Sequence, residues 1–482
     1  MGLKLALFNI ADFNSASRFS SLGLAYITAY LRKYSNLKDI YILEGNVASK
    51  LKKIKPDVIG IFSVTQTFKE ACQAARSIKA ERPNIPIIIG GYHITALPHM
   101  LADVFDVAVL GEGEETMKQL LGVIAKYGIR PDKLSALEGI AFHNGDKTII
   151  TRPREFIKDL DCIPYPARDL LIDTRFCSII TSRGCFYKCI FCSSAGFWGA
   201  PRFHSSGYVV NEIEELIVKF GVAHISIWDD LFVANRGRLE AICSLIDKKK
   251  INKKVSFGCA LRSDLVTPEL CVLMKRMNID RVSIGFESGS QKILSMLKCS
   301  SVSVQQHIEA VKLCKANKIG VTGTFMIGNP GEKKDDLDKT LELIKQLKLD
   351  GGGTISLAAP LPGTALWEYA RQQEKVSDDM DFTKVGIMNT DFSDPRGFQG
   401  VLLTDEIPKD EFFQIASQIQ KETNKYYIKG LLRWRNISLR NLRFILSRPK
   451  EVAAIIRFVI RYLIGKASIM ERYVFYYKNR NS

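Results

Sequence analysis

The sequence predicts an α/β protein with a doubly wound N-terminal sheet, a partial (β/α)6 barrel and a C-terminal helical region. Three observations lead to this fold class. Short apolar strands alternate with helices over the first 130 residues, and the alternation restarts with a longer period near residue 173 and stops near residue 376. A chain of 482 residues is also long enough for about three domains, at roughly 150 residues each.

Residues 1–130 carry the pattern of a buried parallel sheet. Five segments are short, rich in β-branched residues and bounded by turn residues, namely 4–10, 39–45, 57–64, 86–93 and 107–113. Helical stretches are expected at 21–34, 67–82 and 114–127. Strands that alternate with helices over short loops favour a doubly wound sheet, which binds ligands at the carboxyl ends of its strands.

Residues 131–172 interrupt this alternation. The segment HNGD at 143–146 separates two apolar runs and is typical of a β-hairpin turn. The proline-rich segment IPYPARD at 163–169 is expected to be a linker. We therefore assign 131–172 to a hairpin and a linker between two larger domains.

Residues 173–376 predict six β/α units. Strands are expected at 176–183, 224–229, 255–262, 281–287, 321–327 and 353–359, and helices at 206–220, 236–249, 268–278, 303–318 and 332–348. Thr267 followed by Pro268 is a helix start, with a capping hydroxyl and proline at the first helical position. Six units are three-quarters of a (β/α)8 barrel, so we expect a partly open barrel with its site at the carboxyl ends of the strands.

Residues 377–482 form a mostly helical and strongly basic C-terminal region. The chain has 68 Lys and Arg against 51 Asp and Glu, a net charge of +17. Residues 425–482 alone hold 14 Lys and Arg against two Glu. The body of the chain is therefore close to neutral, and its charge does not by itself imply nucleic-acid binding.

Composition excludes several classes of protein. Hydrophobic residues make up 46% and charged residues 25% of the chain, which is typical of a globular protein. No run of eighteen uncharged apolar residues occurs, and the first residues suit a strand better than a signal peptide. We expect a cytoplasmic protein, in which eleven cysteines are free thiols or metal ligands and not disulfides.

The most specific signal is the cluster Cys185, Cys189 and Cys192, which directly follows the first barrel strand. Three thiolates on one short loop can hold three irons of a [4Fe-4S] cluster and leave the fourth iron open. Structural zinc usually takes four protein ligands as two separated pairs, and the sequence has no second pair. The other cysteines are scattered singly, at 72, 162, 177, 243, 259, 271, 299 and 314.

A C-x3-C-x2-C motif at this position, with Phe191 before the last cysteine, resembles the radical S-adenosylmethionine (radical SAM) enzymes. The chain is similar in particular to their cobalamin-binding branch, which includes Mg-protoporphyrin monomethyl ester cyclases and carbon and phosphorus methylases. The segments that carry this resemblance span nearly the whole chain: GGYHITALP, LGEGEET, FWGAPRFHSS, WDDLF, GFESGSQKIL, MIGNPGE and PLPGT.

The resemblance implies a [4Fe-4S] cluster on the three cysteines, with S-adenosylmethionine on the open iron. An electron from the cluster then yields a 5′-deoxyadenosyl radical, while the barrel positions the reactants and excludes water. The residues expected to bind S-adenosylmethionine follow successive barrel strands: Asp229, Asp230, Arg262, Glu287, Ser288 and Asn329. The structural alternatives are a helix cap for one of the two aspartates, an ion pair for Arg262 and a turn for the segment that contains Asn329.

The resemblance also implies that residues 1–130 form a cobalamin-binding-like domain. Glycines and small hydroxyls at the carboxyl ends of its strands are the expected contacts: Ser63, Thr65, Gly90, Gly91, Gly111, Glu112 and Gly113. The alternative is that these residues form ordinary tight turns. Many such domains carry D-x-H-x-x-G, whose His binds cobalt, but residues 12–17 here read DFNSAS. Cobalamin without a His ligand and loss of cobalamin binding both remain open, and we expect His93 to be a structural residue or to support the site indirectly, and not to bind cobalt.

The expected reaction is methyl transfer to an unactivated carbon of a hydrophobic or biosynthetic small molecule. One S-adenosylmethionine would methylate cobalt and a second would generate the radical. Two alternatives remain open: an oxidative cyclase or rearrangement enzyme of the Mg-protoporphyrin ester cyclase type, and a non-catalytic iron-sulfur electron-transfer protein.

The expected partners are a small-molecule substrate, lipid-like or tetrapyrrole, and an external electron donor. The basic C-terminus, with an amphipathic helix expected from Pro449, suits peripheral contact with the inner face of a membrane or a helical cap on the barrel. No nucleic acid is expected, because no RNA-binding module is evident.

Overall fold

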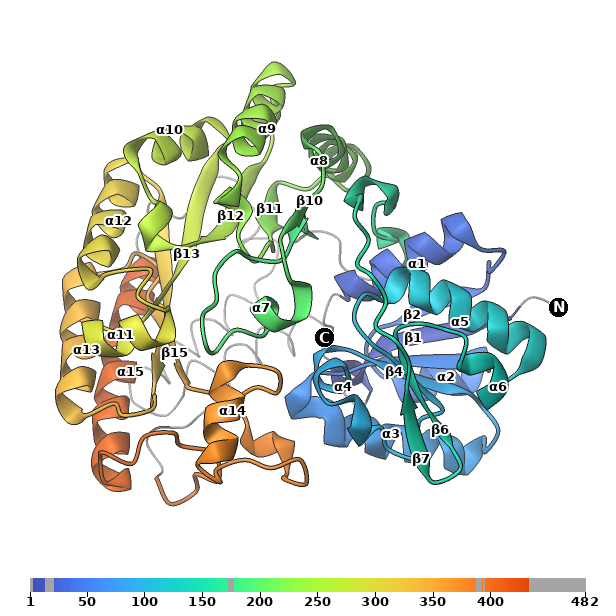
Figure 1. The fold of residues 1–482 in the computed structure, drawn as a ribbon. Helices are drawn as coiled ribbons and strands as arrows, with labels where there is room; N and C mark the ends of the chain where they lie inside the picture. The colour runs from blue at the N-terminus through green and yellow to red at the C-terminus, as the bar shows by residue number, and fades with distance from the viewer. Residues whose placement is uncertain (1–2, 14–20, 172–176, 387–391, 393–394, 433–482) are drawn as a thin grey trace.

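The computed structural model describes residues 3–13, 21–171, 177–386, 392 and 395–432. These residues form two α/β lobes that lie side by side, with the N-terminal sheet in one and the barrel strands in the other (Figure 1). The long C-terminal helix lies against the barrel lobe, on the side away from the N-terminal lobe. The expected helix from Pro449 lies outside the described residues.

The N-terminal sheet has seven strands in the order β2-β1-β3-β4-β5-β6-β7. The five parallel strands are β1 (Leu5–Asn9), β2 (Ile40–Leu43), β3 (Val58–Phe62), β4 (Ile87–Gly90) and β5 (Val107–Val109). The predicted hairpin is β6 (Ile140–Asn144) and β7 (Lys147–Ile150), and it adds to the sheet antiparallel to β5. The hairpin therefore extends the N-terminal sheet.

Helices cover both faces of this sheet, as a doubly wound fold requires. They are α1 (Leu22–Tyr34), α2 (Val47–Ile54), α3 (Phe68–Glu81), α4 (Tyr92–Ala96), α5 (Gly113–Tyr127) and α6 (Pro131–Leu134). Successive strand residues point to opposite faces. Leu5 and Leu7 pack toward α1 and α5, whereas Ala6 and Phe8 pack toward α2 and α3.

The barrel sheet has six parallel strands in the order β15-β14-β13-β12-β11-β8, which is the order of the chain. Their bounds are β8 (Cys177–Ile179), β11 (His224–Ile227), β12 (Ser256–Leu261), β13 (Ile279–Glu287), β14 (Gly320–Ile327) and β15 (Gly353–Leu357). Strands β8 and β15 each pair on one side only within the described residues, so this is the predicted open, partial barrel.

Helices of the barrel lobe cover the outer face of its strands (Figure 1). Those expected from the sequence are α8 (Ser206–Phe220), α9 (Arg236–Lys248), α10 (Pro268–Arg276), α12 (Val304–Ala316), α13 (Lys334–Leu347) and α15 (Lys409–Leu432). The Thr267 hydroxyl accepts a hydrogen bond from the backbone N–H of Leu270, as the predicted cap requires. Buried strand residues such as Ile284 and Phe325 form one core with these helices.

Several short elements were not predicted, and most of them lie near the space between the lobes. They are β10 (Arg202–Phe203), α7 (Ser193–Trp198), α11 (Gln291–Leu297) and α14 (Ala365–Gln372), with α2, α4 and α6 of the N-terminal lobe. The strand predicted at 176–183 is divided into β8 and a short β9 (Ser182–Arg183), which pairs with β10. Such elements are too short to show a helical or strand period in sequence. No helix of the described residues is long and apolar enough to span a membrane.

Candidate functional site

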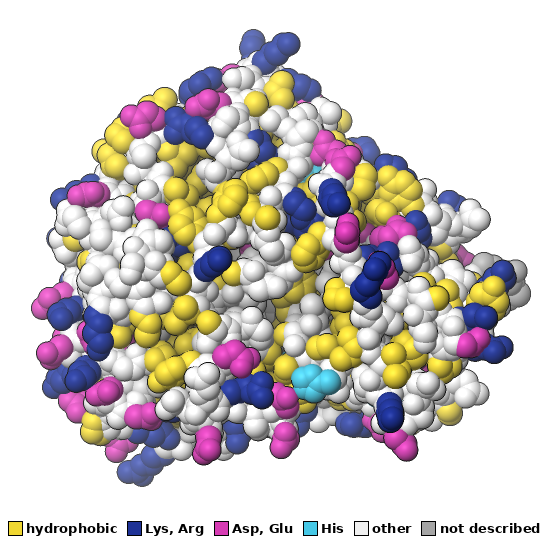
Figure 2. Space-filling view, viewed as in Figure 1, with side chains coloured by type: hydrophobic (Ala, Val, Ile, Leu, Met, Phe, Trp, Pro, Cys, Tyr) yellow, Lys and Arg dark blue, Asp and Glu magenta, His cyan; other side chains and the backbone are white. Residues whose placement is uncertain are grey.

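A cavity of about 440 Å³ lies where the carboxyl ends of the N-terminal strands meet the barrel lobe. One wall consists of Phe62, Gly90 and Gly111, which end three N-terminal strands or directly follow them. The opposite wall includes Trp228 and Asp230, which directly follow β11. In Figure 2, hydrophobic side chains gather in the hollow between the lobes.

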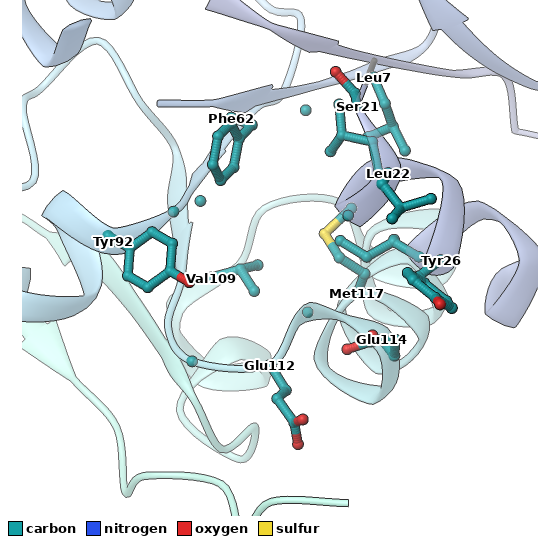
Figure 3. Close-up of a pocket in the computed structure, with 18 of the residues that line it drawn as sticks. Leu7, Ser21, Leu22, Tyr26, Phe62, Tyr92, Val109, Glu112, Glu114 and Met117 are labelled. Carbon is teal, nitrogen blue, oxygen red and sulfur yellow. The ribbon is translucent and has the colours of Figure 1, made fainter. Parts of the chain in front are cut away.

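The inner part of the cavity is apolar and extends between the sheet and two helices. It is lined by Leu7 of β1, by Leu22 and Ile27 of α1, and by Met117 of α5. In Figure 3, Tyr92 and Met117 point toward the centre of the cavity, whereas the Glu112 carboxylate turns away from it. A Cβ at Gly60 would come within 2.5 Å of the Leu7 side chain, so glycine at this position lets Leu7 keep its place in the cavity wall.

Arg183 of β9 joins the two lobes through a buried ion network. Its Nη1 lies 2.6 Å from Glu112 Oε1, and its Nη2 lies 2.6 Å from Glu114 Oε1. The three side chains are only 7%, 4% and 5% exposed. Arg202 of β10 adds a third ion pair, 3.0 Å from Glu112. The segment Gly111–Glu114 thus holds the barrel lobe with its carboxylates and borders the cavity with its backbone.

The cysteine loop lies between β9 and α7. Cys185, Cys189 and Cys192 are free thiols and partly buried. Burial raises the pKa of all three thiols, and the charge of Arg262 partly opposes this at Cys189. The Asp230 carboxylate accepts a hydrogen bond from the backbone N–H of Gly184, which directly precedes Cys185, and its charge raises the pKa of Cys185 and Cys192 further. Thiols in such a site lose their protons when a metal binds them.

The donor set of this loop fits a multi-iron cluster better than a single ion. Within the described part of the chain, no three His, Cys, Asp or Glu side chains converge on one ion-sized point. A [4Fe-4S] cluster does not require such convergence, because each thiolate binds a different iron. Arg262 Nη1 lies 3.3 Å from Cys189 Sγ, an N–H donor of the kind that an iron-bound thiolate accepts.

Asp229 and Asp230 have different surroundings although they are neighbours. Asp229 is buried and accepts hydrogen bonds from the Thr181 backbone N–H and from the hydroxyls of Thr181 and Ser182, so it ties the end of β11 to the end of β8. Burial raises the pKa of Asp229. Asp230 is exposed, accepts one hydrogen bond from the Gly184 backbone N–H at 3.0 Å, and lines the cavity.

Arg262 and the residues after β13 are held by protein partners. Arg262 Nε forms an ion pair with Asp264 at 3.1 Å, which is the structural alternative considered from the sequence. Glu287 pairs with buried Lys298 at 3.2 Å and has a left-handed backbone, with φ of 60°. Ser288 is fully buried, and its Oγ lies 3.3 Å from Thr340 Oγ1.

Asn329 belongs to a closed turn. Its Nδ2 donates to the Met326 carbonyl at 2.9 Å and to Glu332 Oε1 at 3.1 Å, and the residue is fully buried. Glu332 also accepts hydrogen bonds from the backbone N–H groups of Gly328 and Asn329. The Asn329 side chain therefore stabilises the turn after β14.

The predicted cobalamin contacts divide into two groups. Gly90, Gly91, Gly111, Glu112 and Gly113 line the cavity. Ser63 and Thr65 are buried and are not among the described residues that line it. A Cβ at Gly91, where φ is 123°, would come within 2.0 Å of the Ser63 carbonyl oxygen, so Ser63 supports this turn through its backbone.

His93 is structural, as expected. Its ring is fully buried between Phe68, at a centroid distance of 4.2 Å, and Phe382, at 4.6 Å. Neither ring nitrogen has a hydrogen-bond partner among the described residues, and burial lowers the pKa of His93 to about 4. The neighbouring Tyr92 lines the cavity instead.

Sequence reasoning missed the aromatic residues around the cavity. Trp228 is 59% exposed, which is unusual for this residue type and occurs here because its ring borders the cavity. Tyr92 contacts Phe197, with 4.6 Å between ring centroids, and so joins α4 to the helix after the cysteine loop. The only sequence signal for Trp228 was its place at a strand end beside Asp229 and Asp230.

Comparison with known proteins gives a family match for each of the two lobes that border the cavity. The radical SAM superfamily matches residues 179–344, and the B12 binding domain matches residues 10–121. The chain is 31% identical to an uncharacterized methyltransferase of Pyrococcus horikoshii, PH0819, over 72% of this chain and 78% of that protein. The chain therefore belongs to the radical SAM superfamily, in the branch that carries a B12 binding domain.

Two further similarities agree with this assignment. The anaerobic magnesium-protoporphyrin IX monomethyl ester cyclase of Cereibacter sphaeroides is 26% identical over 74% of this chain and 61% of that protein. The radical SAM methyltransferase TsrM from Kitasatospora setae has the same fold, with a TM-score of 0.66 and 16% identity over 78% of this chain and 77% of TsrM. The cofactors of the family are a [4Fe-4S] cluster, S-adenosylmethionine and cobalamin.

Removing the Arg183 side chain should cause a large loss of stability, because its ion network is buried. Replacing Arg183 with Met leaves Glu114 buried without its cation, which should lower the free energy of unfolding by about 3–5 kcal/mol. Urea denaturation followed by circular dichroism measures this change. As a control, Arg152→Met removes an arginine that pairs with Glu138 but is 82% exposed, and should leave the free energy of unfolding almost unchanged because water screens this pair. Equal losses in the two variants would contradict a buried network.

Burial of the His93 ring should make the stability of the protein depend on pH. Its pKa is about 4 in the folded chain and 6.5 when unfolded, so the unfolded state binds more protons between these values. Stability should therefore fall as the pH drops from 6.5 to 4, by about 3 kcal/mol for this residue. Chemical denaturation at several pH values should show a shallower fall in His93→Phe. Parallel curves for the two proteins would contradict a neutral buried histidine.

Proposed function

We propose that this enzyme methylates an unactivated carbon of a small molecule, with cobalamin between the lobes and S-adenosylmethionine at the cysteine loop. The observation that carries the proposal is the shared cavity. The glycine turns of the N-terminal sheet lie on one side of it, and Trp228 and Asp230, beside the cysteine loop, lie on the other. A methyl carrier and a radical source would therefore lie close enough to act on one substrate.

Cys185, Cys189 and Cys192 are the proposed cluster ligands. When bound, the cluster and S-adenosylmethionine supply the radical, and cobalamin supplies the methyl group. The chain positions these groups and excludes water from a reactive radical. Partial burial of the loop limits the access of water, and the positive charges of Arg262 and Lys298 partly oppose the rise in the pKa of Cys189 that burial causes.

Asp230 is the proposed partner of the methionine amino group. It is an exposed carboxylate in the cavity, close to Cys185 and Cys192, whereas Asp229 is fully used inside the protein. We keep Glu287 as a second proposed contact, since a non-glycine residue with positive φ stores strain of the kind found at functional sites. Arg262, Ser288 and Asn329 are proposed to act by holding the loops around the cofactor.

The apolar inner cavity is the proposed seat of part of the cobalamin. Gly60 and Gly91 line this cavity, and a Cβ would collide with the Leu7 side chain at Gly60 and with the Ser63 carbonyl oxygen at Gly91. No described residue of the cavity lining is a histidine, so we propose that cobalt lacks a His ligand from this lining.

A second candidate function is oxidative ring closure, because the chain is also similar to the magnesium-protoporphyrin ester cyclase. We favour methyl transfer because the relative at 31% identity, of which the chain covers 78%, is a methyltransferase. We further propose an external low-potential electron donor and peripheral membrane contact through residues 433–482, with a lipid-like substrate. Sedimentation of the full chain with anionic vesicles tests the membrane contact, and equal binding to neutral vesicles would contradict it.

An anaerobic turnover assay tests the proposed chemistry. The reconstituted enzyme with S-adenosylmethionine, cobalamin and a low-potential reductant should form 5′-deoxyadenosine, measured by liquid chromatography and mass spectrometry. Cys189→Ala should lower the yield at least a hundredfold and abolish the cluster absorbance. Cys162→Ala removes a partly buried thiol elsewhere and should keep both. A full cluster in Cys189→Ala would contradict the ligand assignment.

Gly23 provides a test of the cobalamin site. It lies in α1 and lines the cavity, and no atom of the described residues lies within 4 Å of a Cβ placed on it. Gly23→Trp should therefore fill the cavity and weaken hydroxocobalamin binding at least tenfold, measured by absorbance titration. Gly122→Trp is the matched control, because Gly122 has equally open surroundings on α5 and does not line the cavity. Equal affinity in the two variants would contradict the proposed seat.

A further inference from the structure

The guanidinium of Arg262 is fixed on four sides at the cysteine loop. Its Nη1 lies 3.3 Å from Cys189 Sγ, and its Nη2 donates to Ser301 Oγ at 2.7 Å. Its Nε pairs with Asp264 at 3.1 Å, and its plane lies 3.4 Å from the centroid of the Tyr187 ring. All five donors of a guanidinium lie in one rigid plane, so these contacts leave it little freedom to turn away from the sulfur.

Tyr187 and Asp264 make this arrangement part of the loop itself. Tyr187 lies between Cys185 and Cys189, and its hydroxyl donates to Asp264 Oδ2 at 2.7 Å. Asp264 thus holds both the arginine and the tyrosine beneath it. The Arg262 and Asp264 side chains are 10% and 12% exposed, so water screens their charges weakly.

We propose that Arg262 is a positioning residue that raises the reduction potential of the cluster through its hydrogen bond to the Cys189 sulfur. This inference rests on the proposed cluster ligands. Reduction adds one electron from the external donor and takes up no proton, so it adds one negative charge to the cluster and its thiolates. An N–H donor and a positive charge at a ligand sulfur stabilise the reduced form more than the oxidised form.

The other charged groups near Cys189 determine whether each variant should raise or lower the reduction potential. Lys298 also acts on Cys189, but its Nζ is paired with Glu287 at 3.2 Å and donates to the Gly285 carbonyl. Asp264 pairs with Nε of Arg262, whereas Nη1 is the atom that faces the sulfur. Asp264 therefore partly offsets the arginine charge without interrupting the hydrogen bond. Removing Arg262 should lower the potential, and neutralising Asp264 should raise it.

A redox titration of the reconstituted cluster, followed by electron paramagnetic resonance, tests this proposal. At the midpoint potential of the unmodified enzyme, Arg262→Met should lower the ratio of reduced to oxidised cluster at least tenfold, a shift of 59 mV for a one-electron couple. Asp264→Asn should raise the ratio at least threefold. Arg276→Met removes an exposed arginine that pairs with Asp247 at 2.7 Å, and should change the ratio less than twofold.

Measuring the iron content of each variant distinguishes a failure of this inference from a failure of the proposed function. A full cluster in all variants with unchanged potentials overturns this inference and leaves the proposed function intact. If Arg262→Met loses its cluster, the Asp264→Asn variant provides the test. A raised reduction potential in Asp264→Asn supports the inference, and an unchanged or lowered potential overturns it. An unmodified enzyme that binds no cluster overturns both proposals. Opposite shifts in the two variants are the expected result, because a role in loop stability alone would not change sign with charge.

Discussion

The buried pairing of Arg183 with Glu112 and Glu114 is the constraint on which the rest of the site depends. A buried charge costs several kcal/mol unless its partners are close and well aligned, and both contacts here are 2.6 Å long. The acids follow a strand of the N-terminal sheet and the arginine directly precedes the cysteine loop. One interaction therefore fixes the distance between the edge that carries the glycine turns and the loop that carries the thiols, and the cavity exists because these two edges face each other.

Several charged side chains near the cavity are bound by other groups of the protein. Asp229 supports two strand ends, Arg262 is paired with Asp264, and Lys298 is paired with Glu287. These hydrogen bonds and ion pairs partly satisfy the charges within the protein. The cavity itself is lined by glycine backbone, aliphatic and aromatic side chains and the Asp230 carboxylate, and the other two acids of its lining, Glu112 and Glu114, are paired with Arg183. Such a lining suits a large cofactor with apolar faces and a radical that must be kept from water.

Much of the fold could be predicted because its strands and helices follow clear periods, and the cysteine spacing alone indicated the loop that we propose to hold the cluster. The roles of single residues were harder to predict from the sequence. Glu112 lies 71 residues from Arg183, and no local pattern predicts such a pair. Asp229 and Asp230 could have been separated, because neighbouring residues at a strand end point to opposite faces. The pairing of Asn329 with Glu332 three residues later is also a local signal, typical of a closed turn. The short elements α7, β9 and β10 depend on contacts between the lobes, which sequence periodicity does not contain.

The central claim is that one cavity between the lobes brings the cobalt and the cluster together. Crystals of the reconstituted enzyme with cobalamin, measured at the iron and cobalt absorption edges, test it most directly. The account predicts an iron peak bounded by Cys185, Cys189 and Cys192 and a cobalt peak between Gly91 and Trp228. A cobalt peak at full occupancy outside this cavity, or an iron peak away from the three thiols, would contradict it.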